Sequence, residues 1–160
     1  MQKKVHMAFG VFCGLVALYF LRVPFGVWSI SSITNASLFL AAAFVASTIP
    51  DYDLLIPGMR HRGISHSLLA LMVVTIISTI AGLYFKHDTL FWFCAGFPIG
   101  YLSHLISDSF TDHRVAWLQP FDNTPYGYPI FNTGSALIQG ILMILLWCAN
   151  GALIYLILGG

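Results

Sequence analysis

The sequence consists mainly of long apolar runs separated by short polar segments. A helix needs about 20 predominantly apolar residues to cross a bilayer, and five runs have that length: residues 5–21, 28–49, 63–85, 89–107 and 135–158. The runs lack the alternation of barrel strands, and only helices and closed barrels satisfy every backbone polar group in lipid. The pattern therefore predicts an all-α, helical membrane protein with about five transmembrane helices, in a single integral membrane domain over residues 1–160.

Composition supports this prediction and excludes several classes of function. Hydrophobic residues make up 58% of the chain and charged residues 8%, whereas a soluble domain carries about 25% charged residues. The net charge of +1 provides no basic surface, so we expect no nucleic-acid partner. All six acidic residues are aspartate, which excludes mechanisms that need a glutamate, such as that of the HExxH metalloproteases.

The basic residues predict an orientation in the membrane. Five crossings place five of the seven basic residues on the side that holds the N-terminus: Lys3, Lys4, Arg60, Arg62 and Arg114. Arg22 and Lys86 fall on the other side. Because Lys and Arg are enriched in cytoplasmic loops, we expect the first side to face the cytoplasm.

Seven candidate metal ligands fall on this same side, delivered by four of the expected helices: His6, Asp51, Asp53, His61, His66, His104 and Asp108. Ionisable residues in or near membrane spans are costly, so each one suggests a function. Taken singly, each has a structural alternative, such as an interfacial anchor for His6 or an ion pair of Asp53 with Arg60 or Arg62. Those alternatives do not explain why all seven reach one face, which favours a metal or catalytic site.

Spacing refines this hypothesis. His104 and Asp108 are four residues apart on a helix and share a face, which Thr111 extends. If the segment holding Asp51 and Asp53 is extended, the two side chains point to opposite sides, so that one can bind a metal while the other orients a histidine. A mixed set of His and Asp favours zinc, with manganese or iron as alternatives. We expect one or two divalent ions.

We assign the candidate residues to two roles. The expected metal ligands are His6, Asp53, His66, His104 and Asp108. The expected catalytic residues are Asp51, His61 and Arg62. If His66 and His104 bind one ion, their ring nitrogens must lie within about 8 Å of each other, since each would be about 2.1 Å from the ion. Arg60, Arg62 and the backbone amides at the start of the third helix are suited to bind a phosphate group.

With these motifs in view, the chain resembles the YdjM-like family of inner-membrane metal-dependent hydrolases of bacteria and archaea. The matching pieces are His6 in KKVHMAFG, PDYD at 50–53, HRGISHS at 61–67, SHLISD at 103–108 with Thr111, and WLQPF at 117–121. A remote likeness to zinc-dependent phospholipase C rests on His104 and Asp108, which match its HxxxD element. That enzyme's later His and Glu have no counterpart here, which favours one or two metals over three. The resemblance implies a multi-pass protein of the inner membrane.

Two functions remain open from the sequence. The first is a metal-dependent hydrolase that cleaves a phosphoester of a membrane lipid or another membrane-associated substrate, using a metal-activated water and an aspartate as proton acceptor. The alternative is a metal-ion or proton binding or transport protein that uses the same His and Asp cluster. A transporter needs polar groups through the membrane midplane, whereas the ionisable groups here lie at one end. We also expect the aromatic segment 111–133 to cover the site as a lid or rim.

Overall fold

The protein is described by a computed structural model that covers residues 3–21, 29–58, 61–112, 114–132 and 134–159. It contains five α-helices and two short 3-10 helices: α1 (Lys3–Phe20), α2 (Ile30–Ala46), η1 (Ile49–Leu55), η2 (Ile64–His66), α3 (Leu68–Tyr84), α4 (Asp88–Ser109) and α5 (Ala136–Gly159). Within these ranges the chain forms no β-strand beyond two isolated bridges. The prediction of an all-α protein with five helices is confirmed.

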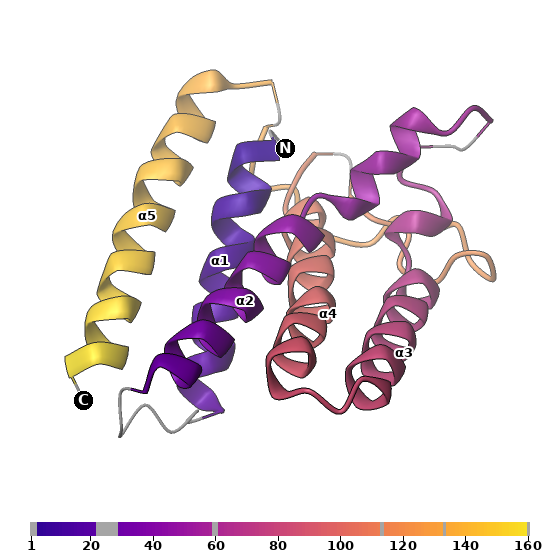
Figure 1. Ribbon diagram of the computed structural model, residues 1–160. Coiled ribbons are helices and arrows are strands. Elements are labelled where there is room, and N and C mark those ends of the chain that lie inside the picture. Colours follow the sequence, from indigo (N-terminus) through magenta and orange to yellow (C-terminus); the bar gives the residue numbers. More distant parts are fainter. Residues whose placement is uncertain (1–2, 22–28, 59–60, 113, 133, 160) are drawn as a thin grey trace.

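The helices form a bundle with α4 at its centre (Figure 1). Helix α4 packs against α1, α2 and α3, whereas α5 packs mainly against α1. The N-terminal ends of α1, α3 and α5 and the C-terminal ends of α2 and α4 lie at the same end of the bundle. We call this the site end.

Four segments are long and apolar enough to cross a membrane: α1, α4, α5 and the continuous stretch of α2 with η1. Helix α3 is also apolar but has only 17 residues. Its expected start at residue 63 is wrong, because residues 64–66 form a separate 3-10 turn and Ser67 caps the helix by accepting a hydrogen bond from the amide of Ala70. The turn shortens α3.

The second expected helix also ends differently. Helix α2 stops at Ala46, and the chain continues as the 3-10 helix η1, which contains Pro50, Asp51 and Asp53. The extended conformation considered for the two aspartates is therefore wrong. With three residues per turn, positions two apart still point about 120° away from each other, so Asp51 and Asp53 diverge as expected, though for a different reason.

Glycines bring α2 and α4 into close contact near the site end. A Cβ atom on Gly100 would lie 2.2 Å from the carbonyl oxygen of Ala43, and one on Gly96 would lie 2.2 Å from that of Phe39. Small residues allow such close approach between membrane helices, where packing replaces the hydrophobic effect as the driving force. The contact places the end of α2 beside the last turns of α4, where His104 and Asp108 lie.

Candidate metal centre

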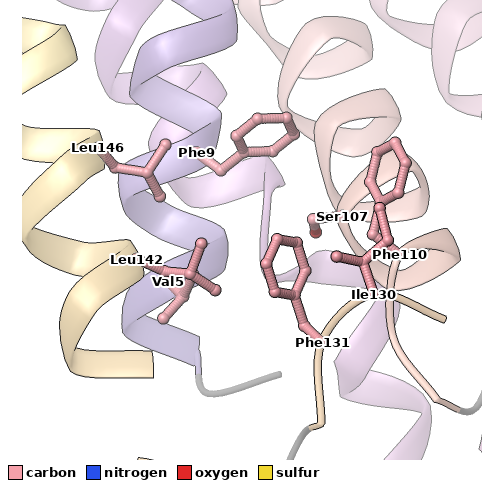
Figure 2. A pocket seen from close by; sticks show the side chains of 8 residues that line it. All are labelled: Val5, Phe9, Ser107, Phe110, Ile130, Phe131, Leu142 and Leu146. Atoms are coloured by element: carbon pink, nitrogen blue, oxygen red, sulfur yellow. The ribbon is translucent and has the colours of Figure 1, made fainter. Parts of the chain in front are cut away.

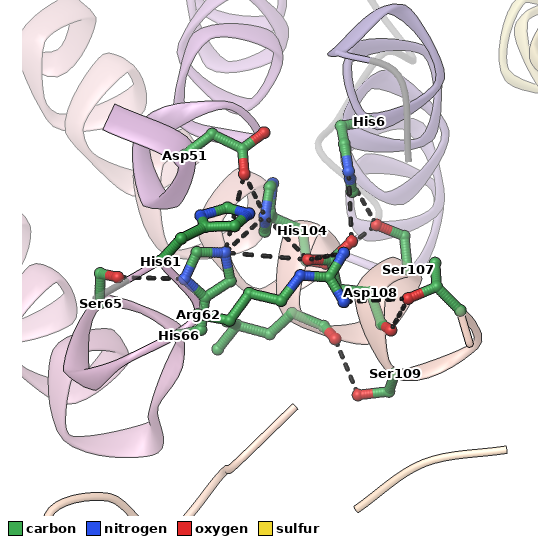
Figure 3. A network of polar contacts seen from close by, with 12 residues as sticks. His6, Asp51, His61, Arg62, Ser65, His66, His104, Ser107, Asp108 and Ser109 are labelled. Carbon is green, nitrogen blue, oxygen red and sulfur yellow. Dashed lines mark hydrogen bonds and ion pairs between the residues drawn. The ribbon is translucent and has the colours of Figure 1, made fainter. Parts of the chain in front are cut away.

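Side chains from α1, η1, the segment before α3, and α4 converge at the site end (Figure 3). The seven candidate ligands are brought together there. Five are almost completely buried: His6, Asp53, His66, His104 and Asp108. Asp51 and His61 are more accessible, with side chains 12% and 38% exposed. The cluster therefore has a buried interior and one accessible side.

Four atoms form the centre of the cluster: Nε2 of His66, Nε2 of His104, Oδ1 of Asp51 and Oδ2 of Asp108. The two nitrogens are 3.2 Å apart. Asp51 Oδ1 lies 3.7 Å from His66 Nε2 and 3.5 Å from His104 Nε2, and Asp108 Oδ2 lies 3.8 Å and 3.6 Å from the same atoms. Ligands bound at about 2.1 Å to a tetrahedral ion are about 3.4 Å from one another, so this spacing suits one ion. The expected proximity of His66 and His104 is confirmed.

The partners of His104 and His6 fix which ring nitrogen carries the proton. His104 Nδ1 lies 2.7 Å from the carbonyl oxygen of Ser47, which can only accept, so Nδ1 is protonated. Ser107 Oγ donates to the carbonyl oxygen of His104 at 2.9 Å and therefore accepts from His6 Nδ1 at 2.7 Å. In the neutral rings, both Nε2 atoms then carry a lone pair. Nε2 of His6 lies 3.3 Å from Asp108 Oδ1.

Asp53 orients the other two histidines in the same way. Its Oδ1 accepts a hydrogen bond from His61 Nδ1 at 2.8 Å. Its Oδ2 accepts from Ser65 Oγ at 2.7 Å, so Ser65 in turn accepts from His66 Nδ1 at 3.0 Å. All four histidines thus have Nδ1 committed to an outer partner and Nε2 available as a ligand. Metal-binding histidines show this arrangement, in which the second nitrogen is held by a carboxylate, a carbonyl or another polar group.

The donor set fits a divalent cation. His66 Nε2 and His104 Nε2 face each other at 3.2 Å with their lone pairs, and the carboxylates of Asp51 and Asp108 lie beside them. A cation between these groups removes the repulsion and neutralises the buried charge. Nitrogen and carboxylate ligands at this spacing suit zinc better than calcium or magnesium, which prefer oxygen.

The cluster also divides into two sets of three ligands. One set consists of His6, His104 and Asp108, and the other of Asp51, His61 and His66, with the ligand atoms within each set no more than 4.8 Å apart. The ligand atoms could therefore hold one ion at the centre or two neighbouring ions, and the number of ions stays a prediction.

The two aspartates of η1 occupy different positions in the cluster. Both oxygens of Asp53 are engaged from behind the histidine rings, by His61, Ser65 and the backbone N–H of Arg62. Asp51 instead places Oδ1 among the Nε2 atoms. From the sequence we expected Asp53 to be a metal ligand and Asp51 to be a catalytic residue. In the structure, Asp51 lies among the ligand atoms.

Arg62 lies at the edge of the cluster. Its guanidinium is 3.2 Å from Asp108 Oδ2 and donates to Thr111 Oγ1 at 3.2 Å, with the side chain 15% exposed. The backbone of Arg62 has φ = 60°, an uncommon conformation for a residue with a side chain. The hydrogen bond from its N–H to Asp53 holds it there. Arg62 thus presents a positive charge beside the ligand atoms.

Three further residues of the site were given no such role by sequence reasoning. Ser47 and Ser107 orient His104 and His6, and the hydroxyl of Tyr101 donates to the carbonyl oxygen of Ser65. A sequence signal exists only for Ser107, which lies next to Asp108 and one turn after His104. Arg22, Arg60 and His113 lie outside the described residues, so the predicted contribution of Arg60 to phosphate binding stays a prediction.

The first part of the loop between α4 and α5 borders the site. The amide of Leu68 donates to the carbonyl oxygen of Trp117 at 2.8 Å, and Trp117 Nε1 donates to Ser109 Oγ at 2.9 Å. Val115 is completely buried, and the carbonyl oxygen of Arg114 accepts from Arg62 at 3.5 Å. This segment is a wall of the site. Farther along, Phe121 and Tyr128 are largely exposed, and their place in a lid stays a prediction.

Comparison with known proteins gives one match. The comparisons found no match among curated proteins or among solved structures. The family described as YdjM inner membrane protein matches residues 1–159. This match agrees with the apolar spans of the bundle and with the resemblance seen in the motifs. The chain is therefore a membrane protein that belongs to the YdjM inner membrane protein family.

Proposed function

We propose that the protein is a metal-dependent hydrolase that acts on a phosphoester of a lipid or another membrane-associated substrate, with zinc as the favoured ion. One observation carries the proposal: four histidines of one cluster each have Nδ1 held by an outer partner, which leaves Nε2 available as a ligand. Two carboxylates complete the centre. Such preorganisation of a ligand set is expected where a metal has to be held in a defined geometry.

The residues around the centre have distinct tasks in this proposal. A divalent ion, when bound, supplies a nucleophilic water at neutral pH. His66, His104 and Asp108 hold the ion. Asp51 lies on the accessible side with its carboxylate beside the ligand atoms, so it is placed to accept a proton. Arg62 binds the phosphate, because a guanidinium matches phosphate oxygens in geometry and charge.

The position of the cluster favours a lipid substrate. Its ligands lie at one end of helices long enough to span a membrane, the depth at which lipid head groups lie. We propose that this end faces the cytoplasm, on the basis of the predicted excess of Lys and Arg there. Acyl esters and amides are other bonds that the same chemistry cleaves.

Metal analysis tests the binding site first. We expect detergent-purified wild-type protein to contain one or two equivalents of a divalent metal, and we expect the His104→Ala variant to lose it. His87→Ala is the matched control, because His87 lies outside the cluster, before the first turn of α4 at the opposite end. A second variant, Asp108→Asn, is also expected to lose the metal and guards against a folding defect of His104→Ala. Equal metal content in all four proteins would contradict the proposal.

Activity is then measured with phosphatidic acid and with p-nitrophenyl phosphate. A chelator should abolish turnover, and added zinc or manganese should restore it. The transport alternative makes the opposite prediction: no hydrolysis with any divalent ion, but movement of a metal into liposomes that requires His104 and Asp108. That result would replace the hydrolase proposal.

A further inference from the structure

An apolar cavity lies next to the metal centre (Figure 2). It has a volume of about 320 Å³ and lies between the first turns of α1 and α5, the end of α4, and residues 130–131 of the connecting loop. Helix α5 packs mainly against α1, and the cavity lies between it and the end of α4. Val5 and Phe9 of α1 line it, together with Leu142 and Leu146 of α5. These positions lie in the N-terminal halves of α1 and α5, so the cavity extends from the site end toward the middle of the bundle.

The chemistry of the lining points to a hydrocarbon ligand. Aromatic and aliphatic side chains form the walls, including Phe110 and Phe131. The single polar side chain among the lining residues is Ser107, and its hydroxyl is already used, since it donates to the carbonyl oxygen of His104 and accepts from His6. The lining side chains therefore offer no free polar partner to a head group, and water in this cavity would lack hydrogen-bond partners.

The cavity and the metal centre share one hydrogen bond. Ser107 faces the cavity, and its Oγ lies 2.7 Å from Nδ1 of His6, which belongs to the cluster. Val5 and Ser107 also directly precede His6 and Asp108 in the sequence. The cavity therefore borders the metal centre directly at His6 and Asp108.

The surroundings identify the occupant as part of a lipid. The cavity is bounded by α1, α4 and α5, which are all long and apolar enough to span the membrane. Between such helices the available apolar molecules are the hydrocarbon chains of the bilayer. Burial stabilises a hydrocarbon chain by about 0.8 kcal/mol per methylene relative to water, but a chain that comes from the bilayer is already out of water. Discrimination between lipids therefore depends on the shape of the cavity and on the head group near the metal centre.

We propose that this cavity is the binding site for one hydrocarbon chain of the lipid substrate. The inference rests on the proposed hydrolase function for the identity of the lipid as a substrate, and on the cavity itself for the binding of the chain. It makes Leu142 and Leu146 specificity-determining residues, since they set the width of the cavity from the α5 side. Helix α5, which contributes no candidate metal ligand, thereby takes part in substrate binding.

Photolabelling tests the binding of the chain. The probe is phosphatidic acid with a diazirine in the middle of one acyl chain, mixed at low mole fraction into vesicles that contain the purified protein. We expect adducts on the peptide that holds residues 130–131, and we expect unlabelled phosphatidic acid to compete for them. The same labelling in His104→Ala would show chain binding independently of catalysis.

A pair of tryptophan variants supplies the control. Leu142→Trp fills the cavity and should lower labelling of residues 130–131 at least fivefold, with Leu146→Trp as a second variant if the first fails to fold. Ile144→Trp, at a position 66% exposed on the opposite side of α5 from Leu142 and Leu146, should leave labelling unchanged. Labelling that is equal in these variants, or that spreads evenly over the outer face of α5 and spares residues 130–131, would overturn the chain site. The latter pattern is also expected if a second copy of the chain filled the cavity.

Kinetics separate this inference from the proposed function. Leu142→Trp should raise KM for long-chain phosphatidic acid about tenfold, a loss of about 1.4 kcal/mol in binding free energy, because the indole occupies the space of the chain. The exposed control variant on α5 should leave that KM unchanged. An unchanged KM in an active enzyme would overturn the inference and leave the hydrolase proposal intact. Competed labelling without hydrolysis of any phosphoester would overturn the assignment of the lipid as a substrate and, with it, the proposed function.

Discussion

Helices α4 and α5 are both long apolar spans, yet the bundle uses them differently. Helix α4 packs against three other helices, and its glycines leave no room for a Cβ atom against α2. Helix α5 packs mainly against α1, and Cβ atoms on Gly140 and Gly151 would meet nothing within 4 Å. Close packing is therefore concentrated where the polar ligands have to be held, and loose packing leaves an apolar cavity beside them.

The largest expected effect comes from adding one methyl group to α4 at its contact with α2. Gly100→Ala places a Cβ 2.2 Å from the carbonyl oxygen of Ala43, so α2 and α4 must move apart. We expect a loss of about 3 kcal/mol in the free energy of unfolding, at the upper end of the usual cost of overpacking, together with loss of bound metal. Unfolding in detergent and metal analysis measure both.

Gly140→Ala in α5 is the matched control, since its Cβ meets open space. It should leave metal content unchanged and stabilise the helix by up to about 1 kcal/mol through helix propensity. Equal destabilisation by the two variants would show that close packing of α4 does not distinguish it from α5.

The next prediction concerns serines on the two helices. Ser107→Ala in α4 removes the acceptor for His6 Nδ1, so the ring loses its fixed orientation. We expect metal affinity to fall about 10- to 100-fold, as found for outer partners of metal ligands, with little change in the fold. Ser135→Ala, before the first turn of α5, loses a hydrogen bond from the amide of Ile138 and should leave the affinity unchanged. Isothermal titration with zinc distinguishes them, and an unaltered affinity in Ser107→Ala would remove the positioning role.

A smaller effect tests how α5 is attached. Asn150 is buried in the contact with α1, and its Nδ2 donates to the carbonyl oxygen of Ala8 at 3.2 Å. Asn150→Leu should cost about 0.6 kcal/mol, the average for polar contacts between membrane helices, and should leave metal content at the wild-type level. Loss of metal in this variant would show that α5 supports the site directly.

The smallest effect lies in the loop that joins the two helices. A hydrogen bond from the Thr124 hydroxyl, aided by the Thr124 amide and by Tyr126, holds the pKa of Asp122 below its ordinary value. This contact therefore stabilises the loop above the ordinary pKa and is lost as the pH falls through the lowered one. Thr124→Val should raise the pKa, which carbon NMR of the labelled carboxyl would detect. A pKa equal to that of the wild type would show that the turn is not formed in solution.

Much of the architecture follows from the sequence. The five apolar runs predict the five helices, and the helix order alone places His6, Asp51, His66, His104 and Asp108 at one end. Short-range features were less predictable. The start of α3 depends on a serine cap, and the 3-10 conformation of η1 depends on a proline after α2. The apolar pattern alone predicts a continuous helix at both places.

The roles within the site required the tertiary structure. Asp51 and Asp53 are equivalent in the sequence pattern, and only the fold directs one toward the Nε2 atoms and the other behind the rings. The contact of Ser47 with His104 could not be predicted for the same reason. Hydrogen bonds between residues far apart in the chain depend on helix contacts that periodicity does not encode.

The sequence by itself determined that this chain is a helical membrane protein with a polar cluster at one end, because the cost of burying charge in lipid confines ionisable residues to the ends of spans. The tertiary structure decided the distances within that cluster, the protonated nitrogen of each histidine, and the cavity beside α5. Those features arise from how closely helices approach, and a single Cβ at Gly96 or Gly100 would change that approach.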